Sequence, residues 1–469
     1  MDGREKFFIL SSPVSQEVAS LWTLVPNLND DSVFLHPEEG KGKRDGIRQS
    51  FVDFVDRILA MQGDSPIEKF SLKCITGVHP DTVNRWICNV LQRGVSDLNL
   101  FIDFSYEDIE DGYYLPREMF VSKTLVELKI RSEHSVDLWT VGEATFLPML
   151  KTLDVDSDLI YCGKVEMLLS YFPVLENLRM ANMVRMESHE TVSSASLKKL
   201  TLSIQWEDYE SPKSISFDTP SLLYLNYSDL VADDYPLVNM KNLVEGRINF
   251  MADEDQIEQA RAPDNDLLAN DEEAIVLPFD NVMKLMNGIQ NVQRLYLASD
   301  TLEVLSLCGK SMPVFNNVKI LYITSDEGRA WQAMPDLLRN CPNLEYLVME
   351  GLLHYVTDKC GDFCDCIARG DKGRSLTSCP VTKLEIRGFK GTMREINMIR
   401  HFLRFFRCLK EVGIFPEEDD PTNFENPGVF ELVEKILNLY HDEFSSCDVV
   451  FLVDNHLRRK WTAQSSLRV

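Results

Sequence analysis

The chain has 469 residues, 44% of them hydrophobic, and its 48 Lys and Arg stand against 74 Asp and Glu, giving a formal net charge of -26. A phosphate backbone binds proteins through cationic contacts, so this charge excludes nucleic acid and anionic membrane surfaces as expected partners. No apolar run approaches the roughly 20 residues of a membrane helix or the apolar core of a signal peptide, so we expect an intracellular protein, cytoplasmic or nuclear.

Two amphipathic helices are predicted near the start of the chain. Apolar residues recur at the helical period over residues 47–59 and again over residues 81–92. Terminal units of a repeat array need a cover for their open apolar end. These helices are therefore expected to belong to the first repeats.

A short apolar phrase, Leu-x-x-Leu-x-apolar, returns along the chain with a period of 22 to 25 residues in its clearest stretch. This period is typical of leucine-rich repeats, in which each strand and its return segment must stack on a neighbour to bury their apolar side. The sequence thus predicts an α/β solenoid, a curved horseshoe with parallel strands on its concave face. The phrase occurs at Ile67/Phe70/Leu72, Val95/Leu98/Leu100, Leu125/Leu128/Ile130, Leu150/Leu153/Val155, Leu175/Leu178/Met180, Leu197/Leu200/Leu202, Leu222/Leu225/Tyr227, Val292/Leu295/Leu297, Val318/Leu321/Ile323 and Leu344/Leu347/Met349.

An acidic loop interrupts the array at residues 252–273, where nine acidic residues accompany a single basic one, Arg261. Before it the phrase weakens to Leu243-x-x-Gly-x-Ile248. Such a like-charged stretch resists packing, so it is interpreted as a solvated excursion, with an acidic recruitment motif as the alternative. Leu302, Leu305 and Leu307 follow the preceding phrase too closely for another concave strand and are expected on a return segment.

The last part of the chain has a different pattern, which predicts a compact α/β cap. Strands are expected over residues 381–386, 409–414 and 447–452. Thr392 and Glu395 form a capping box that opens a helix, and a second helix is expected around residues 430–440.

Side chains between the apolar anchors of a strand point away from the core, because strand side chains alternate. In the later repeats these positions give an aromatic ladder with an arginine: Tyr224, Arg294, Tyr296, Tyr322 and Tyr346. Tyrosine and arginine are enriched at binding hot spots, so the concave face is the candidate partner-binding surface. Stacked aromatic residues can also simply stabilise a sheet, and both roles can hold at once.

Eleven cysteines are spread over the chain, which in this setting predicts free thiols more than a disulfide framework. Cys360, Cys364, Cys366 and Cys379, with His354 upstream, are candidate ligands of a structural zinc ion, with unliganded thiols as the alternative. Gly309-Lys310-Ser311 resembles the end of a phosphate loop, but Val304 occupies the position of its leading glycine. No other catalytic motif is present, so neither an enzyme nor a cofactor is predicted.

Three phrases together resemble the plant F-box/FBD/leucine-rich-repeat proteins over nearly the whole chain. In that family, as the resemblance implies, an F-box docks on the Skp-type adaptor of a cullin-RING (SCF-type) ubiquitin ligase while the repeats select a protein substrate. The alternatives are a small-molecule-responsive receptor that uses the concave face and a free binding module without ligase docking. The phrases are Trp22-Thr23-Leu24-Val25-Pro26-Asn27-Leu28, Cys379-Pro380-Val381-x-Lys383-Leu384-Glu385-Ile386 and Met398-Ile399-x-His401-Phe402-Leu403.

Only the C-terminal end of an F-box is recognisable, and Met1 to Pro13 is expected to be too short to supply the remaining helices. Either the gene model is truncated or the ligase connection is lost. The remnant of the adaptor-docking site is expected to pack on the first repeat rather than to dock on the ligase, and it comprises Leu21, Trp22, Leu24, Val25 and Pro26. The predicted domains are the F-box remnant 1–32, the solenoid 33–370, the FBD domain 379–451 and a tail 452–469.

Overall fold

The structure is a computed structural model. It divides the chain into two compact units, Met1–Met186 and Glu187–Val469, which are taken in turn. The division falls within the region predicted as one solenoid. The described residues are 27–31, 44–74, 78–102, 114–132, 135–137, 145–161, 164–184, 189–204, 211–252, 257, 279–309, 311–325, 331–352, 354, 360–366, 370, 373–416, 447–453 and 456–461.

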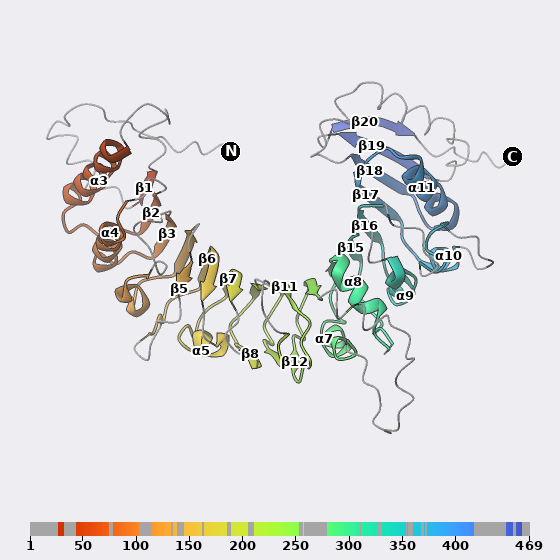
Figure 1. Ribbon diagram of the computed structural model, residues 1–469, viewed down its shortest axis with the longest axis horizontal. Helices are drawn as coiled ribbons and strands as arrows, with labels where there is room; N and C mark the ends of the chain where they lie inside the picture. The colour runs from red at the N-terminus through yellow and green to blue at the C-terminus, as the bar shows by residue number, and fades with distance from the viewer. Residues whose placement is uncertain are drawn as a thin grey trace. The chain divides into compact units, whose positions relative to one another are not determined.

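The first unit is built on a parallel ladder in which β1, β2, β3, β4, β6 and β7 pair in that order, while β5 adds a short pairing to β6. Figure 1 shows these strands side by side in the red to yellow part of the chain. The elements are β1 Asn27–Asp31, α3 Arg44–Met61, β2 Lys69–Cys74, α4 Pro80–Gln92, β3 Asp97–Ile102, η1 Arg117–Val121, β4 Glu127–Ser132, β5 Val136–Asp137, β6 Thr152–Tyr161, α5 Val165–Ser170 and β7 Asn177–Val184.

The repeated apolar phrase sets the register of this ladder. Leu98, Leu128, Leu153 and Leu178 face one another on neighbouring strands, and each is almost fully buried. Shifting a strand by one residue would turn its leucines to solvent, so the buried side specifies the pairing. The predicted parallel repeat strands are confirmed here.

The two helices predicted at the start of the array are α3 and α4. Their apolar faces meet where the Phe51 and Trp86 rings lie edge to face, with centroids 6.0 Å apart and both side chains 1% exposed. The indole N–H of Trp86 donates a hydrogen bond of 2.7 Å to Asp56 on α3. A buried indole is thus provided with a partner, as it requires.

The second unit continues the same construction with a longer ladder. Its strands pair in parallel in the order β9, β11, β13, β14, β15, β16, β17, β18 and β19, and β20 then pairs antiparallel with β19. The strands are β8 His189–Ser193, β9 Lys199–Ile204, β10 Ser214–Asp218, β11 Tyr224–Leu230, β12 Val238–Asn239, β13 Glu245–Met251, β14 Arg294–Leu297, β15 Ile320–Thr324, β16 Tyr346–Glu350, β17 Lys383–Phe389, β18 Glu411–Pro416, β19 Asp448–Val453 and β20 His456–Trp461.

Where the apolar phrase weakens, the ladder still continues. Gly246 on β13 occupies the anchor position between Leu225 on β11 and Leu295 on β14. A Cβ placed on Gly246 would lie 3.7 Å from a methyl group of Val292, so neighbouring side chains already fill the space of the missing anchor. The repeat at Leu243 is therefore a full member of the array.

The return segments of this unit change from strands to helices along the chain. Early ones form a second small parallel sheet of β8, β10 and β12, whereas later ones are helical. Leu302 and Leu305 lie on α8, which confirms the return segment expected there. The helical elements are α7 Val282–Gly288, α8 Ser299–Ser306, η2 Trp331–Ala333, α9 Met334–Arg339, α10 Arg374–Ser378 and α11 Met393–Phe405.

The predicted strands and first helix of the C-terminal region are present as β17, α11, β18 and β19. Thr392 and Glu395 form the expected capping box at the start of α11. The predicted helix around residues 430–440 and nearly all of the acidic loop 252–273 lie outside the described residues. Strand β20 lies within the segment that the sequence analysis leaves as a tail. Among the described helices, none combines the length and apolar character needed to cross a bilayer.

Candidate functional site

One side of the second unit's sheet carries a continuous group of aromatic and charged side chains. These side chains alternate along β11 to β17 with the buried apolar anchors, and we call this side the open face. The tyrosine–arginine ladder is the set Tyr224, Arg247, Tyr296, Tyr322, Tyr346 and Arg387 on that face.

Parallel pairing in register brings the ladder residues together. Arg247 lies opposite Tyr296, and Tyr296 lies opposite Tyr322. The two tyrosine rings are stacked, with centroids 5.3 Å apart and planes inclined by 26°. Because adjacent strands lie about 4.8 Å apart, residues at equal register on neighbouring strands are held at stacking distance.

Cationic side chains cover the rings from strands one or two places away in the sheet. The Arg247 guanidinium lies 4.1 Å from the centre of the Tyr296 ring and 5.7 Å from that of Tyr224. Arg387 lies 5.6 Å from the Tyr322 ring, and the Lys383 ammonium 5.0 Å from the Tyr346 ring. These distances are those of cation–π contacts, which favour arginine over an aromatic face.

Carboxylates fix the arginines and the phenol groups in place. Glu245, 8% exposed, accepts a 2.9 Å hydrogen bond from Arg247 Nε and a 2.7 Å bond from Arg294 Nε. Glu385, 6% exposed, accepts a 2.6 Å bond from Arg387 Nε and a further bond from the Tyr346 hydroxyl. The buried carboxylates are thus paired and hydrogen-bonded, as charges removed from water must be.

Three phenol groups of the ladder, those of Tyr224, Tyr322 and Tyr346, have raised pKa values and stay protonated at physiological pH. Burial, the hydrogen bond that its hydroxyl donates to Glu350, and the charge of that carboxylate together raise the pKa of Tyr322 to about 12, against the opposing effect of Arg387. Burial, followed by the hydrogen bond to Glu385, also raises the pKa of Tyr346, and burial is the largest cause of the raised pKa of Tyr224. A neutral phenol keeps donating its hydrogen bond, so the rings stay where these bonds hold them.

All five predicted concave residues lie on the open face, but they do not play equal parts. Tyr224, Tyr296, Tyr322 and Tyr346 contribute rings, whereas Arg294 contacts Glu245. The sequence does not predict a role for Arg247 and Glu245, since the apolar phrase is weakened at Leu243. It does not predict one for Arg387 and Glu385 either, because it places their strand in the C-terminal cap. The alternation of side chains along β13 and β17 is the sequence signal that identifies these four residues.

The open side of the first unit's strands is polar, as expected for the early repeats. Arg179 donates hydrogen bonds of 2.8 Å to both Asp154 and Asp156 on the neighbouring strand. Lys69 and Asp97 pair at 2.9 Å. These half-exposed pairs add little stability each, so this side is a solvated surface.

The adaptor-docking remnant, Leu21 to Pro26, lies outside the described residues. The segment that follows it forms β1, which pairs in parallel with β2 from Asn27↔Lys69 to Asp31↔Lys73. The parallel ladder therefore starts ahead of the first apolar phrase at Ile67.

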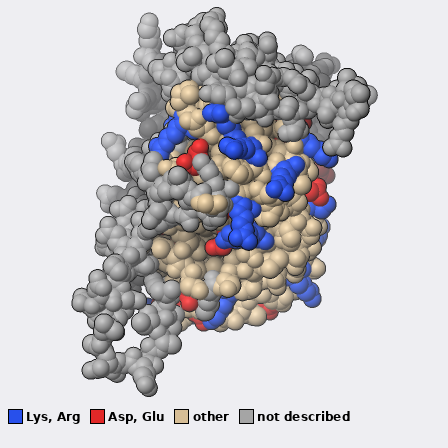
Figure 2. Space-filling model, turned by 90° about the vertical axis from the view of Figure 1, so that its right-hand side faces the viewer, with Lys and Arg blue, Asp and Glu red and all other residues tan. Residues whose placement is uncertain are grey.

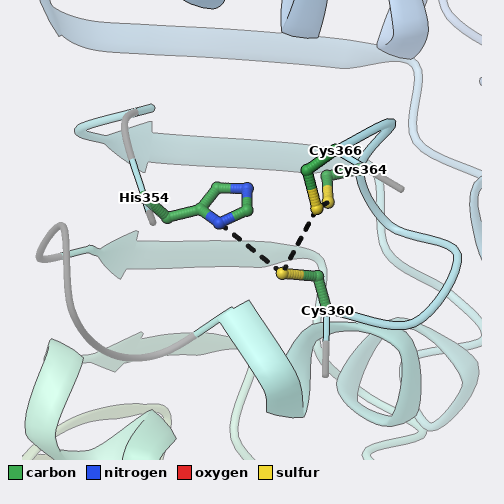
Figure 3. A group of neighbouring side chains, drawn as sticks. All are labelled: His354, Cys360, Cys364 and Cys366. Carbon is green, nitrogen blue, oxygen red and sulfur yellow. Dashed lines mark hydrogen bonds between the residues drawn. The ribbon is translucent and has the colours of Figure 1, made fainter. Parts of the chain in front are cut away.

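Three of the four predicted zinc ligands come together, and the fourth does not. Cys360, Cys364 and Cys366 gather with His354, and their ligand atoms all lie within 4.8 Å of one another. Cys379 is buried at the end of α10, where the chain enters β17. It acts instead on Cys341 of the preceding repeat, whose pKa is raised by burial and then by the Cys379 thiol. Its place in the proposed ligand set is taken by His354 (Figure 3).

The strongly negative charge of the chain is not uniform over its surface. Between Arg374 and Lys410 the sequence has nine basic and two acidic residues. Figure 2 shows Lys and Arg outnumbering Asp and Glu on the side where α10 and α11 lie in Figure 1. A local field of this sign attracts acidic groups, whatever the net charge.

Comparisons with known proteins converge on one family. Residues 83–236 match the family model described as FBD-associated F-box protein At5g56370, LRR repeats. The chain is 70% identical over 462 residues to the F-box/LRR-repeat protein At3g58930 of Arabidopsis thaliana, which covers 98% of this chain and 96% of that relative. From the same plant, the F-box/LRR-repeat protein At3g58940 is 61% identical over 91% of this chain and 65% of its own length. The F-box protein At3g03040 is 58% identical over 94% of this chain and 92% of its own length.

Proposed function

Because this chain belongs to the plant F-box/leucine-rich-repeat family, we propose that it holds a partner protein on the open face of its second unit. In this role it is the substrate-binding part of an adaptor of a cullin-RING, SCF-type ubiquitin ligase. The observation that carries the proposal is the tyrosine–arginine ladder. Tyrosine and arginine are the residues most often found at the energetic centre of protein interfaces.

The size of the ladder favours a protein partner. It extends over six neighbouring strands, β11 to β17, so five inter-strand steps of about 4.8 Å give a length of about 24 Å. A standard interface buries about 800 Å² on each partner, which a surface of this length accommodates.

The chemistry of the ladder points the same way. The Tyr322 and Tyr346 hydroxyls already donate to Glu350 and Glu385, and the Arg387 guanidinium already bonds to Glu385. A small ligand usually needs several polar groups that point toward it, and here those groups already bond to one another. The ring faces and guanidinium planes, in contrast, are held in fixed positions where a partner protein can contact them. Fixed side chains lose little freedom on binding, which strengthens association with a flat protein surface. The small-molecule-responsive receptor is the less favoured function.

Two structural expectations accompany this role. The open face is proposed to be the concave side of a curved horseshoe, and residues 379–451 are proposed to form an FBD cap that closes the array. A protein with this role works in the cytoplasm or the nucleus.

Co-purification with a Skp-type adaptor tests the ligase part of the proposal. The full chain and a plant Skp-type adaptor are co-expressed and separated on a sizing column, with mass measured by light scattering. Co-elution in one peak is the result that the adaptor role requires. A Leu21→Ala/Trp22→Ala variant should separate from the adaptor, because a large apolar anchor is lost from the docking remnant.

The matched control is Tyr114→Ala, which removes an aromatic side chain that is 49% exposed and lies outside both the ladder and the remnant. This variant should co-elute like the parent chain. Separate peaks for the parent chain would contradict the adaptor role and leave a free binding module.

A further inference from the structure

Four side chains with strong affinity for soft metal ions converge in the second unit. Figure 3 shows His354, Cys360, Cys364 and Cys366 pointing toward one another. His354 Nδ1 lies 3.5 Å from Cys360 Sγ, Cys366 Sγ lies 4.0 Å from Cys360 Sγ, and Cys364 Sγ lies 2.9 Å from Cys366 Sγ. His354, Cys360 and Cys364 are 5%, 1% and 2% exposed, and Cys366 is half-buried.

These separations can be compared with a tetrahedral zinc site. A zinc ion bound about 2.3 Å from sulfur and about 2.0 Å from nitrogen holds two sulfurs about 3.8 Å apart, and a sulfur and a nitrogen about 3.5 Å apart. The His354–Cys360 and Cys360–Cys366 separations already match. Of these three separations, only that between Cys364 and Cys366 must increase, by roughly 0.9 Å, which rotation about the side-chain bonds can supply.

The spacing between Cys360 and Cys364 in the chain also suits this geometry, whereas the spacing between Cys364 and Cys366 is shorter than usual for zinc ligands. Three residues separate Cys360 from Cys364, within the two to four residues common between paired zinc ligands. Cys366 then follows Cys364 after one residue. His354 supplies the fourth ligand from the end of the segment that follows β16, so one ion would join two parts of the same connection.

The surrounding structure holds the four side chains in position. The imidazole of His354 stacks on the Trp331 indole, with centroids 4.5 Å apart and planes inclined by 28°. Gly361 has a φ of +60°, and a Cβ there would lie 2.8 Å from Pro335, so the turn beside Cys360 requires glycine. Asp362 accepts a hydrogen bond from the backbone N–H of Ser375 and thereby fixes the turn to α10. Metal sites depend on such supporting contacts to orient their ligands.

The cluster lies where the repeat spacing is abnormal. Paired positions on β15 and β16 are 26 residues apart (Ile320 to Tyr346), whereas those on β16 and β17 are 37 apart (Tyr346 to Lys383). The long connection contains all four side chains. A cross-link here would hold the long return segment against α9 and α10. Without a cross-link, a longer segment has more conformational freedom, which favours its unfolding.

We propose that His354, Cys360, Cys364 and Cys366 bind one structural zinc ion that fastens the connection between β16 and β17. Three thiols and a neutral imidazole form a closed set of four ligands with no open position for a substrate. The thiols release their protons on binding, and no electron is transferred. The ligand atoms lie too close together for more than one ion.

A disulfide between Cys364 and Cys366 is the competing chemistry for this cluster. Their sulfurs are 2.9 Å apart, well beyond the about 2.05 Å of a disulfide bond. In a reducing compartment such a bond would be transient, whereas a buried zinc thiolate persists. The two possibilities differ in metal content and in the number of free thiols, so one preparation distinguishes them.

The test is the metal content of the full chain, expressed in zinc-supplemented cells and purified under reducing, chelator-free conditions. One zinc ion per chain is expected by mass spectrometry of the metal. Replacing zinc by cobalt should give the intense visible bands of tetrahedral coordination together with thiolate charge-transfer absorption in the near ultraviolet. A wild-type chain that holds no stoichiometric zinc, or that carries a Cys364–Cys366 disulfide instead, would overturn the proposal.

Variants identify the ligands. Cys360→Ser and Cys366→Ser should reduce zinc to background, while His354→Cys should keep the ion and alter the cobalt spectrum, because a fourth thiolate replaces the imidazole. Cys408→Ser, at an exposed cysteine, and Cys379→Ser, at the buried cysteine outside the cluster, should both retain one ion. Circular dichroism establishes which variants fold. Full zinc in folded Cys360→Ser, or loss of zinc from folded Cys379→Ser, would contradict this ligand set.

Discussion

Arg247 shows how single residues of the ladder combine two roles. Its guanidinium covers the Tyr296 ring at 4.1 Å and, through Nε, neutralises the buried Glu245. A cation that is bound at one edge still has a free planar face for a neighbouring ring. The same arrangement recurs at Arg387 between Glu385 and Tyr322, so the ladder repeats one local motif.

Arg247→Ala should lower the free energy of unfolding by about 1 kcal/mol. The substitution removes a cation–π contact and one of the two arginine partners of Glu245, and the 43% exposure of the Arg247 side chain keeps the loss below that of a buried pair. Urea unfolding followed by fluorescence measures the change.

Arg339→Ala is the matched control for this measurement. Its ion pair with Asp336 is about half-exposed on both sides, so the loss should stay within about 0.5 kcal/mol. Equal losses for the two variants would show that the Glu245 contacts add nothing beyond an ordinary surface ion pair.

The residues of the site were predictable only in part. Alternation along a strand identifies Tyr296 and Tyr322 from the sequence, because their neighbours are apolar anchors. It does not show that Arg247 covers Tyr296, since that contact joins strands separated by the acidic loop. In the metal cluster, the sequence does not distinguish Cys379 from the other candidate ligands, whereas the fold gathers His354 with Cys360, Cys364 and Cys366 and leaves Cys379 outside the cluster.

At the scale of single elements, α11 is the helix whose start is most sharply specified. The Thr392 hydroxyl accepts from the backbone N–H of Glu395, and the Glu395 carboxylate accepts from the backbone N–H groups of Thr392 and Lys390. Glu395 is 1% exposed, so these bonds satisfy a carboxylate that water does not reach.

Thr392→Ala should therefore destabilise the second unit by about 1 kcal/mol, the usual cost of losing an N-cap side chain. Thr392→Ser retains the hydroxyl and should restore most of the loss. Thermal unfolding by circular dichroism compares the two variants with the parent chain. An alanine variant that melts with the parent would mean that the cap does not hold α11.

Elements with a strong local pattern were predictable, and those that depend on distant partners were not. The leucine phrase predicts the repeat strands, and periodicity predicts α3, α4 and α11. Strands β8, β10 and β12 have no such phrase, because their pairing is set by the stacking of return segments. Strand β20 is short and polar, with Arg458, Arg459 and Lys460 in sequence, and it pairs antiparallel with β19.

On the scale of the whole molecule, the two units divide the chemistry of the open strand faces. On these faces the first unit has paired charges and the second has the ladder, while the cysteine–histidine cluster lies in the connection between β16 and β17. An array of repeats distributes its stability over neighbouring repeats, so side chains on one face can be changed without unfolding the rest. Mutations on the open face are therefore expected to weaken partner binding while the chain stays folded.

The measurement that tests the central claim most directly is the affinity of a partner for the ladder variant. A protein that co-purifies with the full chain from plant tissue is isolated, and its binding is measured by calorimetry. The compared chains are the parent, Tyr296→Ala/Tyr322→Ala/Tyr346→Ala, and the control Tyr114→Ala.

The ladder variant should bind at least about 30-fold more weakly, which corresponds to the loss of a single hot spot of about 2 kcal/mol, while the control binds as the parent does. Circular dichroism should show that both variants are folded. A folded ladder variant that keeps the parent's affinity would contradict recognition by the open face.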